Sequence, residues 1–395
     1  MTETITLADA LKRNQLDEAR KKLEQHEKLP KDLPSHEQRS IYDQLVQAKA
    51  FDIITQLVQH HSIETDLYEY KQLDGSIFES IFRYLGKAQA DQEFLAAFLE
   101  KVDNINDAVN NKTLLQLAFN RSVPVELIQV LADAGCDVHY KDNYEEGYLH
   151  KIIQEYDIKE ATGLVYFEYL LEQGLDLNAG NIVRTTPLHV ALDRNKRQYV
   201  DFLLQQGADP NLPGKDGETA FYMAVVHQVC DAALYEKLAQ YAPADFNVIN
   251  KNGETLLGGA LRMRNASERD IQLIKALVRD GADVYQTSVY YSQDKAAMDW
   301  VSEKNGDLLE ALLEMGVVDL DHRDNSGNTL LHKVCAYNVN YDQEAARQLY
   351  RKAKMLLAQG ADVNALNDQD QSPMDLAAQD NLKAKTVELL LKHKA

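Results

Sequence analysis

The chain has 395 residues, of which 45% are hydrophobic and 26% are charged, and 62 acidic against 42 basic side chains give a formal net charge of −20. This length exceeds what one ordinary core supports, so we expect either two or three domains or one repeat array. The acidic field repels phosphate backbones and anionic lipid headgroups, which excludes nucleic acid and membrane surfaces as expected partners.

The first 104 residues contain weak helix pairs, which we interpret as a degenerate N-terminal capping region. The clearest pair is Thr6-Leu-Ala-Asp-Ala-Leu11 followed by residues 16–23. Spacing extrapolated back from the stronger pattern downstream places further helix starts at Ser40 and Ser76. Residues 67–75 are the least regular part of this region. An alternative therefore stays open, in which residues 1–104 are a separate functional unit, which could be catalytic, and the rest of the chain targets it.

A repeat with a period close to 33 residues runs from about residue 105 to the end of the sequence. Its clearest copy opens with Thr186-Pro-Leu-His-Val-Ala191 and closes with Gly207-Ala-Asp-Pro-Asn211. The third position of each copy is large and apolar, and the sixth is mostly alanine, as expected where stacked helices meet. The copies open at Thr113, Gly147, Thr186, Thr219, Thr255, Ala296, Thr329 and Ser372. Successive opening residues are 34, 39, 33, 36, 41, 33 and 43 residues apart.

This unit resembles the ankyrin-repeat family, whose motif is T-P-L-H-x-A followed by a leucine run and G-A-D-V-N. The resemblance implies an all-α solenoid of stacked helix–turn–helix repeats with β-hairpin fingers. About 9–11 repeats fill the chain and are degenerate at the N-terminus. We expect residues 1–104 to hold ankyrin-like helix pairs and residues 105–395 to form the array, with the last repeat, 367–395, as its C-terminal cap.

Connections between repeats keep a constant length, whereas the spacing inside the repeats varies. Four connections, such as that from Gly135 to Gly147, are 12 residues long. The interval from the opening residue to the closing glycine is 21 residues in the copy at Thr186, but 31 in the copy at Thr329. We expect the extra residues to bulge between the two helices, opposite the fingers, as surface padding or as a second binding surface.

One finger departs from this rule. The segment from Gly281 to Ala296 is 15 residues long and carries Tyr285, Tyr290 and Tyr291. Tyrosines on an extended hairpin are costly to expose unless something packs on them. They therefore contact either the adjacent finger or a partner.

We find no sequence pattern of a catalytic, cofactor-binding or metal site, so we expect no enzyme, no cofactor and no metal. The three cysteines, Cys136, Cys230 and Cys335, are too few and too scattered for a disulfide framework or a zinc site. Trp300 is interpreted as a core residue. The family resemblance implies that one column of histidines bridges neighbouring fingers: His150, His189 and His332.

The expected partner surface is the concave face, which consists of finger tips and the exposed side of the first helices. Tyr144, Ile182 and Val183 would place aromatic and apolar groups at adjacent tips, a composition typical of an interface centre. The remaining candidate binding residues are Arg194, Lys251, Arg262, Tyr285, Tyr290 and Tyr291.

The favoured function is a non-catalytic scaffold that binds another protein through residues 140–340. A narrower alternative is an acidic inhibitor or immunity-type protein for a basic partner. The start of the chain has no basic and apolar leader, and no apolar run reaches about 18 residues. We therefore expect a monomer in the cytoplasm.

Overall fold

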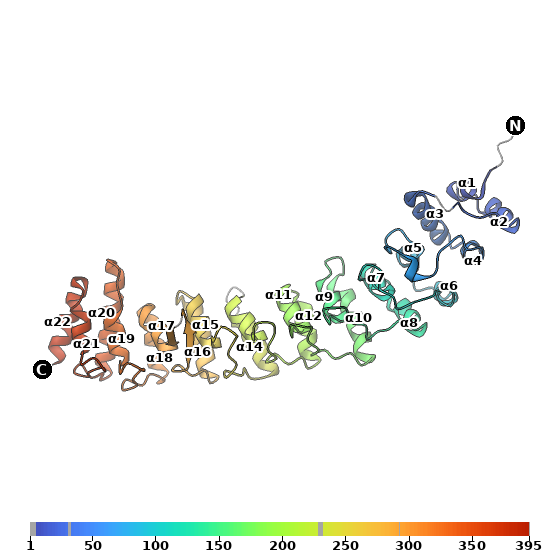
Figure 1. Ribbon diagram of the computed structural model, residues 1–395. Helices are drawn as coiled ribbons and strands as arrows, with labels where there is room; N and C mark the ends of the chain where they lie inside the picture. Colours follow the sequence, from blue (N-terminus) through green and yellow to red (C-terminus); the bar gives the residue numbers. More distant parts are fainter. Residues whose placement is uncertain (1–4, 31–32, 228–231, 292, 395) are drawn as a thin grey trace. The chain divides into compact units, whose positions relative to one another are not determined.

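The computed structural model describes residues 5–30, 33–227, 232–291 and 293–394, and these residues form helix pairs and one hairpin (Figure 1). The chain divides into two compact units, one up to Gln206 and one from Gly207 onward. Each unit is a stack of helix pairs, which confirms the predicted all-α solenoid class. Eleven pairs are present among the described residues, within the expected range of repeats.

The first unit contains six pairs. Its elements are α1 (Leu7–Lys12), α2 (Leu16–Glu24), α3 (Ser35–Gln47), α4 (Phe51–Gln59), the short η1 (Leu67–Glu69), α5 (Ile77–Tyr84), α6 (Gln89–Leu99), α7 (Leu114–Asn120), α8 (Val125–Asp133), α9 (Tyr148–Gln154), α10 (Glu160–Glu172), α11 (Pro187–Asp193) and α12 (Arg197–Gln205). Each pair has a first helix, such as α11, and a second helix, such as α12.

The second unit contains five pairs and the hairpin. Its elements are α13 (Ala220–Tyr222) continued by the π-helical η2 (Met223–His227), α14 (Ala232–Tyr241), α15 (Leu256–Met263), α16 (Glu268–Arg279), β1 (Thr287–Tyr290), β2 (Gln293–Ala296), α17 (Ala297–Glu303), α18 (Gly306–Glu314), α19 (Leu330–Ala336), α20 (Gln343–Ala358), α21 (Pro373–Ala377), η3 (Asn381–Lys383) and α22 (Ala384–His393). Cys230 lies outside the described residues.

The eight predicted opening residues of the array are all N-cap residues of first helices. The Thr113 hydroxyl, for example, accepts a hydrogen bond of 3.1 Å from the Gln116 amide, one of the amides that a helix start leaves without a partner. Ala296 has no hydroxyl, and there the Asp299 carboxylate accepts the Ala296 amide at 2.7 Å instead. The periodic pattern therefore located the helix starts correctly, even where the capping chemistry differs.

The helix start predicted at Ser40 is wrong. Ser40 lies in the middle of α3, which begins after Pro34 at its N-cap position. A helix start tolerates proline because the amide that proline lacks would have no partner there, so this helix starts at Ser35, five residues earlier, without any hydroxyl cap. Thr6 and Ser76 are N-caps of α1 and α5.

The core follows the two predicted columns of the motif. Third-position side chains such as Leu115, Leu149 and Leu188 are buried, whereas Met374 in the last pair is half-buried. The sixth-position alanines have no exposed surface: Ala118, Ala191, Ala224, Ala260 and Ala377. Small side chains at these positions let the two helices of a pair approach closely, and large ones fill the space between pairs.

The second helix of most pairs ends on a glycine with a left-handed backbone. Gly135 has φ +99° and Gly360 has φ +97°, and a β-carbon at either would meet no atom within 4 Å. Glycine is therefore needed there for its dihedral angle and not for space. An aspartate stands two residues after this glycine, and its carboxylate accepts a hydrogen bond from the backbone amide two residues further along the chain. Asp137, for example, accepts from the His139 amide at 2.8 Å. This turn starts each connection.

A second turn residue shapes five of the finger tips, and sequence analysis missed it. An aspartate or asparagine stands five residues before the N-cap, and its side-chain oxygen accepts the two backbone amides that close the tip. Asn181, for example, accepts from Val183 and Thr185 at 3.1 and 3.0 Å. The same residue type does this in five fingers: Asp142, Asn181, Asn250, Asp324 and Asn367. The tip is thereby fixed locally.

The extra residues inside long repeats mainly lengthen the second helix, which corrects the expectation of a bulge between the helices. In the 21-residue copy, α11 and α12 have 7 and 9 residues. In the 31-residue copy, α19 also has 7 residues, but α20 has 16, so seven of the ten extra residues are helical. The other three lengthen the loop 337–342. A longer second helix keeps its amides bonded, which a long loop would not.

Residues before 105 pack directly on the array within the first unit. The Glu79 carboxylate on α5 is buried and pairs with Arg83 of the same helix. It also accepts from Arg121, the C-cap residue of α7, at 2.6 Å and from Arg39 on α3 at 3.4 Å. One carboxylate thus joins three successive helix pairs, and the N-terminal pairs belong to the same compact unit as α7–α12. Whether residues 1–104 are ankyrin repeats stays a prediction.

Candidate protein-binding surface

Three apolar side chains stand exposed on two neighbouring finger tips of the first unit. Tyr144 is 65% exposed on the finger that Asp142 closes, and Ile182 and Val183 are 61% and 39% exposed on the finger that Asn181 closes. We call these three residues the tip patch. The structure therefore brings together the three candidates that sequence analysis ranked highest.

The backbone beneath the tip patch is tied down from several sides. The Ile182 amide donates to the Tyr144 carbonyl at 2.9 Å, so the two tips are joined directly. The Glu146 carboxylate accepts from Gln154 of α9 and from Asn181 of the next finger, both at 3.1 Å. These bonds connect both fingers to α9, so the patch is presented on an ordered support. An ordered surface loses little conformational entropy on binding.

Lys151 adds an ion pair to the same support. Its ammonium donates to Asp142 at 2.6 Å, and both side chains are largely covered. Burial alone would raise the pKa of Asp142, but the bonds from Lys151 and from two backbone amides hold that pKa below its ordinary value. Asp142 therefore stays ionised and keeps the turn under Tyr144 closed.

Arg194 lies at the other end of α11 from the tip patch, about 10 Å along a seven-residue helix. It is exposed and donates to the Tyr156 hydroxyl at 2.7 Å, with its guanidinium 5.8 Å from the centre of that ring. Tyr156 is itself an exposed residue, and sequence analysis missed it. The available signal was its place in the extra residues of the copy that opens at Gly147. An exposed tyrosine–arginine pair is the composition enriched at interface centres.

The two basic candidates of the second unit are both engaged within the chain. Lys251 pairs with Asp216 of the preceding finger, and its amide donates to the Asp216 carbonyl at 2.8 Å. Arg262 is half-buried and binds both oxygens of Glu254, at 2.6 and 3.0 Å. The Glu254 carboxylate raises the pKa of Arg262 further. These side chains stabilise their own fingers, so Arg262 in particular presents little free charge.

The tyrosines of the long finger do not share one environment. The Tyr285 ring lies 3.9 Å from the His322 ring of the next finger, and its hydroxyl accepts the Asp319 amide at 2.6 Å. Tyr290 packs against Trp300, with ring centres 4.9 Å apart. Tyr291 is 85% exposed at the end of β1. The first two tyrosines therefore support the finger, and Tyr291 alone of the three faces outward.

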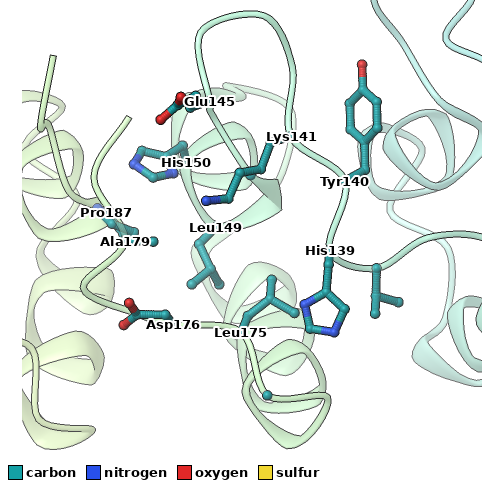
Figure 2. A pocket seen from close by; sticks show the side chains of 13 residues that line it. His139, Tyr140, Lys141, Glu145, Leu149, His150, Leu175, Asp176, Ala179 and Pro187 are labelled. Carbon is teal, nitrogen blue, oxygen red and sulfur yellow. The ribbon is translucent and has the colours of Figure 1, made fainter. Parts of the chain in front are cut away.

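A hollow of about 250 Å³ lies at the base of the two fingers that carry the tip patch (Figure 2). Lys141 reaches into it, with Glu145, His139 and Asp176 around the rim (Figure 2). His150 also lines it, but the ring donates to the Thr185 carbonyl at 2.8 Å, and burial lowers its pKa. Burial lowers this pKa although the bond to the Thr185 carbonyl raises it, so His150 is part of the finger support and is a poor general base.

The remaining histidine, cysteine and tryptophan candidates also support the fold. The His332 ring accepts from Thr329 and donates to the Gln371 carbonyl at 3.1 Å, so it bridges two fingers as the family resemblance implied. Burial raises the pKa of Cys136 and of Cys335 to about 12, which leaves both thiols protonated and unreactive. Trp300 is buried, as expected. Across the described ranges, no group of three or more His, Cys, Asp or Glu side chains could hold a metal ion.

Comparison with known families places the repeats in the middle of the chain. Residues 115–214 and 160–250 match the family model described as ankyrin repeats (3 copies). Within the described residues, no helix has the length and apolar character needed to cross a bilayer.

Two curated relatives are similar over larger parts of the chain. Rabankyrin-5 of Homo sapiens is 26% identical over 343 residues, which is 81% of this chain and 26% of that protein. The E3 ubiquitin-protein ligase KEG of Arabidopsis thaliana is 28% identical over 200 residues, which is 49% of this chain and 10% of that protein. The chain thus spans about a quarter or less of these relatives.

Among solved structures, the ankyrin repeat domain of Bcl-3, a member of the IkappaB protein family, is similar with a TM-score of 0.48 and 21% identity. The match covers 61% of this chain and 98% of that one.

Proposed function

We propose that this chain, which is an ankyrin-repeat protein, is a non-catalytic scaffold whose tip patch forms the centre of the contact with another protein. Ankyrin repeats generally mediate protein–protein interaction. The observation that carries the proposal is the exposure of Tyr144, Ile182 and Val183 side by side on a bonded backbone. Other tips carry polar residues at these positions, such as Lys215 and Asp216 or Asn325 and Ser326.

The surroundings of the tip patch suit an interface. Large exposed side chains on an ordered support gain apolar contact area without ordering a loop first, and a tyrosine adds a hydroxyl for the rim. Arg194 at the C-cap of α11 and Tyr156 in the loop after α9 would extend the contact along α11. The proposal also includes a basic partner, because the net charge of −20 would steer a positively charged surface toward this face.

The proposal is tested with the triple variant Tyr144→Ser, Ile182→Ser, Val183→Ser. Tagged wild-type chain is used to purify the partner from its native cell, and mass spectrometry identifies it. The triple variant should fold with an unchanged circular dichroism spectrum and capture less than a tenth of that partner. A matched control replaces exposed apolar residues elsewhere: Tyr68→Ser, Val165→Ser and Leu391→Ser. Equal capture by the triple variant and the control would refute this assignment of the binding surface.

A cytoplasmic location is part of the same proposal. It is supported by Cys136 and Cys335, two buried free thiols. Such thiols are usual where the surroundings are reducing.

A further inference from the structure

The long finger of the second unit ends in a strand edge that faces a hollow. β1 and β2 pair antiparallel, with Val289 opposite Asp294 and Thr287 opposite Ala296. A hollow of about 560 Å³ is lined by β2 on one side and by residues 322–326 of the next finger on the other. This volume lies within the range of about 300–1,000 Å³ that is typical of ligand pockets.

The directions of the backbone groups on the hairpin follow from two hydrogen bonds. The Val289 amide donates to the Gly253 carbonyl of the preceding finger at 2.9 Å, so it points away from β2. The Ala296 amide donates to Asp299, so it points away from β1. The amide and carbonyl groups of every second residue point to the same edge of a strand. In a non-hydrogen-bonded pair of an antiparallel hairpin, the amides and carbonyls of both residues point away from the partner strand. Val289 and Asp294 form such a pair. The amide and carbonyl of Asp294 therefore point away from β1, to the edge that borders the hollow.

Elsewhere in this unit, an amide of one finger donates to a carbonyl of the finger before it. Lys251 bonds to Asp216, Val289 to Gly253, and Asp368 to Ser326, at 2.8 to 3.1 Å. Between β2 and the finger that Asp324 closes, the described residues contain no such bond. The hollow lies at this position.

Two charged side chains that line the hollow have no ion pair within the described ranges, Asp294 on β2 and Arg323 on the other side, where the Arg323 guanidinium donates to the Gly327 and Leu366 carbonyls at 2.9 and 2.6 Å. Asp299 and Asp324 share the Lys333 ammonium, and Lys295 pairs with Glu303. Asp294 is exposed. Tyr285, held against His322, adds an aromatic surface to the hollow.

We propose that the edge of β2 binds an extended peptide segment of a partner protein, which adds as a third strand between β2 and residues 322–326. The Asp294 amide and carbonyl would pair with the peptide backbone, as in other cases of strand addition. The segment carries a basic side chain next to the Asp294 carboxylate and an apolar one against Tyr285. This inference rests on the proposed protein-binding function and names a second contact point, separate from the tip patch.

The experiment uses the full chain and a phage-displayed library of random 12-residue peptides as the probe. Selected peptides are synthesised, and their dissociation constants are measured for wild type, Asp294→Ala and Asp294→Pro. Both variants lose the carboxylate, but only proline also loses the outward amide. Because that amide does not pair with β1, proline should leave the hairpin and the melting temperature intact. We expect binding to Asp294→Pro to be at least tenfold weaker than binding to Asp294→Ala.

A second measurement replaces single residues of the peptide by their N-methyl forms. Strand addition predicts that every second position is sensitive, because only alternate amides face β2. Equal affinity for the two Asp294 variants, an N-methyl profile without this alternation, or failure to select any peptide would overturn the inference. A peptide whose binding is lost in the Tyr144, Ile182 and Val183 variant but not in Asp294→Pro would overturn it as well, while leaving the proposed function intact.

Discussion

The amide of Ile182 donates a hydrogen bond of 2.9 Å to the carbonyl oxygen of Tyr144, and this bond fixes the distance between the two tips of the patch. Each tip is closed by its own turn residue, Asp142 in one and Asn181 in the other. The exposed side chains are therefore held by main-chain bonds and turn side chains and do not depend on their own packing. Substituting them should leave the fold in place, and substituting the turn residues should not.

The variant Asp142→Ala tests this division. It removes the acceptor of the Tyr144 and Glu146 amides and leaves Lys151 without its partner. Loss of these bonds should lower the free energy of unfolding by about 1–3 kcal/mol and weaken partner capture. Asp142→Asn is the matched control, because asparagine closes the tips at Asn181 and Asn250. It should cost less than half as much. Urea unfolding measures both, and equal losses would mean that the ion pair with Lys151, and not the turn, matters.

Glu79 provides the second prediction. Its carboxylate is buried and accepts from Arg121 and Arg39 as well as pairing with Arg83. Replacing it with alanine leaves three arginines without their shared acceptor, at an expected cost of about 3 kcal/mol. Because Glu79 joins α3, α5 and α7, the loss should lower the stability of residues before and after position 105 together. Hydrogen exchange followed by mass spectrometry reports this. Faster exchange confined to residues 5–99 would contradict a continuous first unit.

The sequence predicted features that depend on local chemistry and missed those that depend on distant partners. Thr113 and Thr186 could be placed because a hydroxyl cap and the apolar positions after it lie within one helical turn. Ser40 was misplaced because spacing alone located it, whereas Pro34 starts the helix.

The candidate site shows the same limit. Tyr144, Ile182 and Val183 could be singled out as candidates because a finger tip is normally polar, so apolar residues there stand out in the sequence. Arg262 was predicted as a contact residue, but Glu254 of the finger before it binds its guanidinium. Glu254 and Arg262 are eight residues apart in the sequence, and their ion pair depends on how the finger folds back on α15. Tyr156 was missed because only its place in the extra residues of the copy that opens at Gly147 marked it, and its residue type did not.

Charge steering gives the third prediction. If the partner is basic, the net charge of −20 should speed association, and salt should screen this attraction. Between 50 and 500 mM NaCl we expect the association rate constant to fall about tenfold or more, while the dissociation rate constant changes about threefold or less. Surface plasmon resonance with the purified partner measures both constants. An association rate that does not respond to salt would remove the basic character of the partner from the proposal and leave the tip patch unaffected.

Lys352 gives the last prediction, on pH dependence. It is only 1% exposed, and its ammonium donates to the carbonyls of Ser302 and Lys304, at the C-terminal end of α17. Burial lowers its pKa from the ordinary 10.5 to about 8. Between about pH 8 and pH 10.5, Lys352 is protonated in the unfolded chain and deprotonated in the folded chain. Its contribution to the free energy of unfolding therefore rises with pH. Below pH 8 both states carry the charge, and the folded state bears the cost of burying it.

The variant Lys352→Met removes this titration and leaves the other groups in place. The free energy of unfolding of wild type relative to Lys352→Met should therefore increase by about 2 kcal/mol between pH 7 and pH 9.5. Urea unfolding at both pH values measures it, and other groups that titrate in this range cancel in the difference. Lys354→Met on the same helix serves as the control and should show no such change. A constant difference would mean that Lys352 keeps its proton in the folded chain throughout this range, because the two carbonyls stabilise the ammonium more than burial disfavours it.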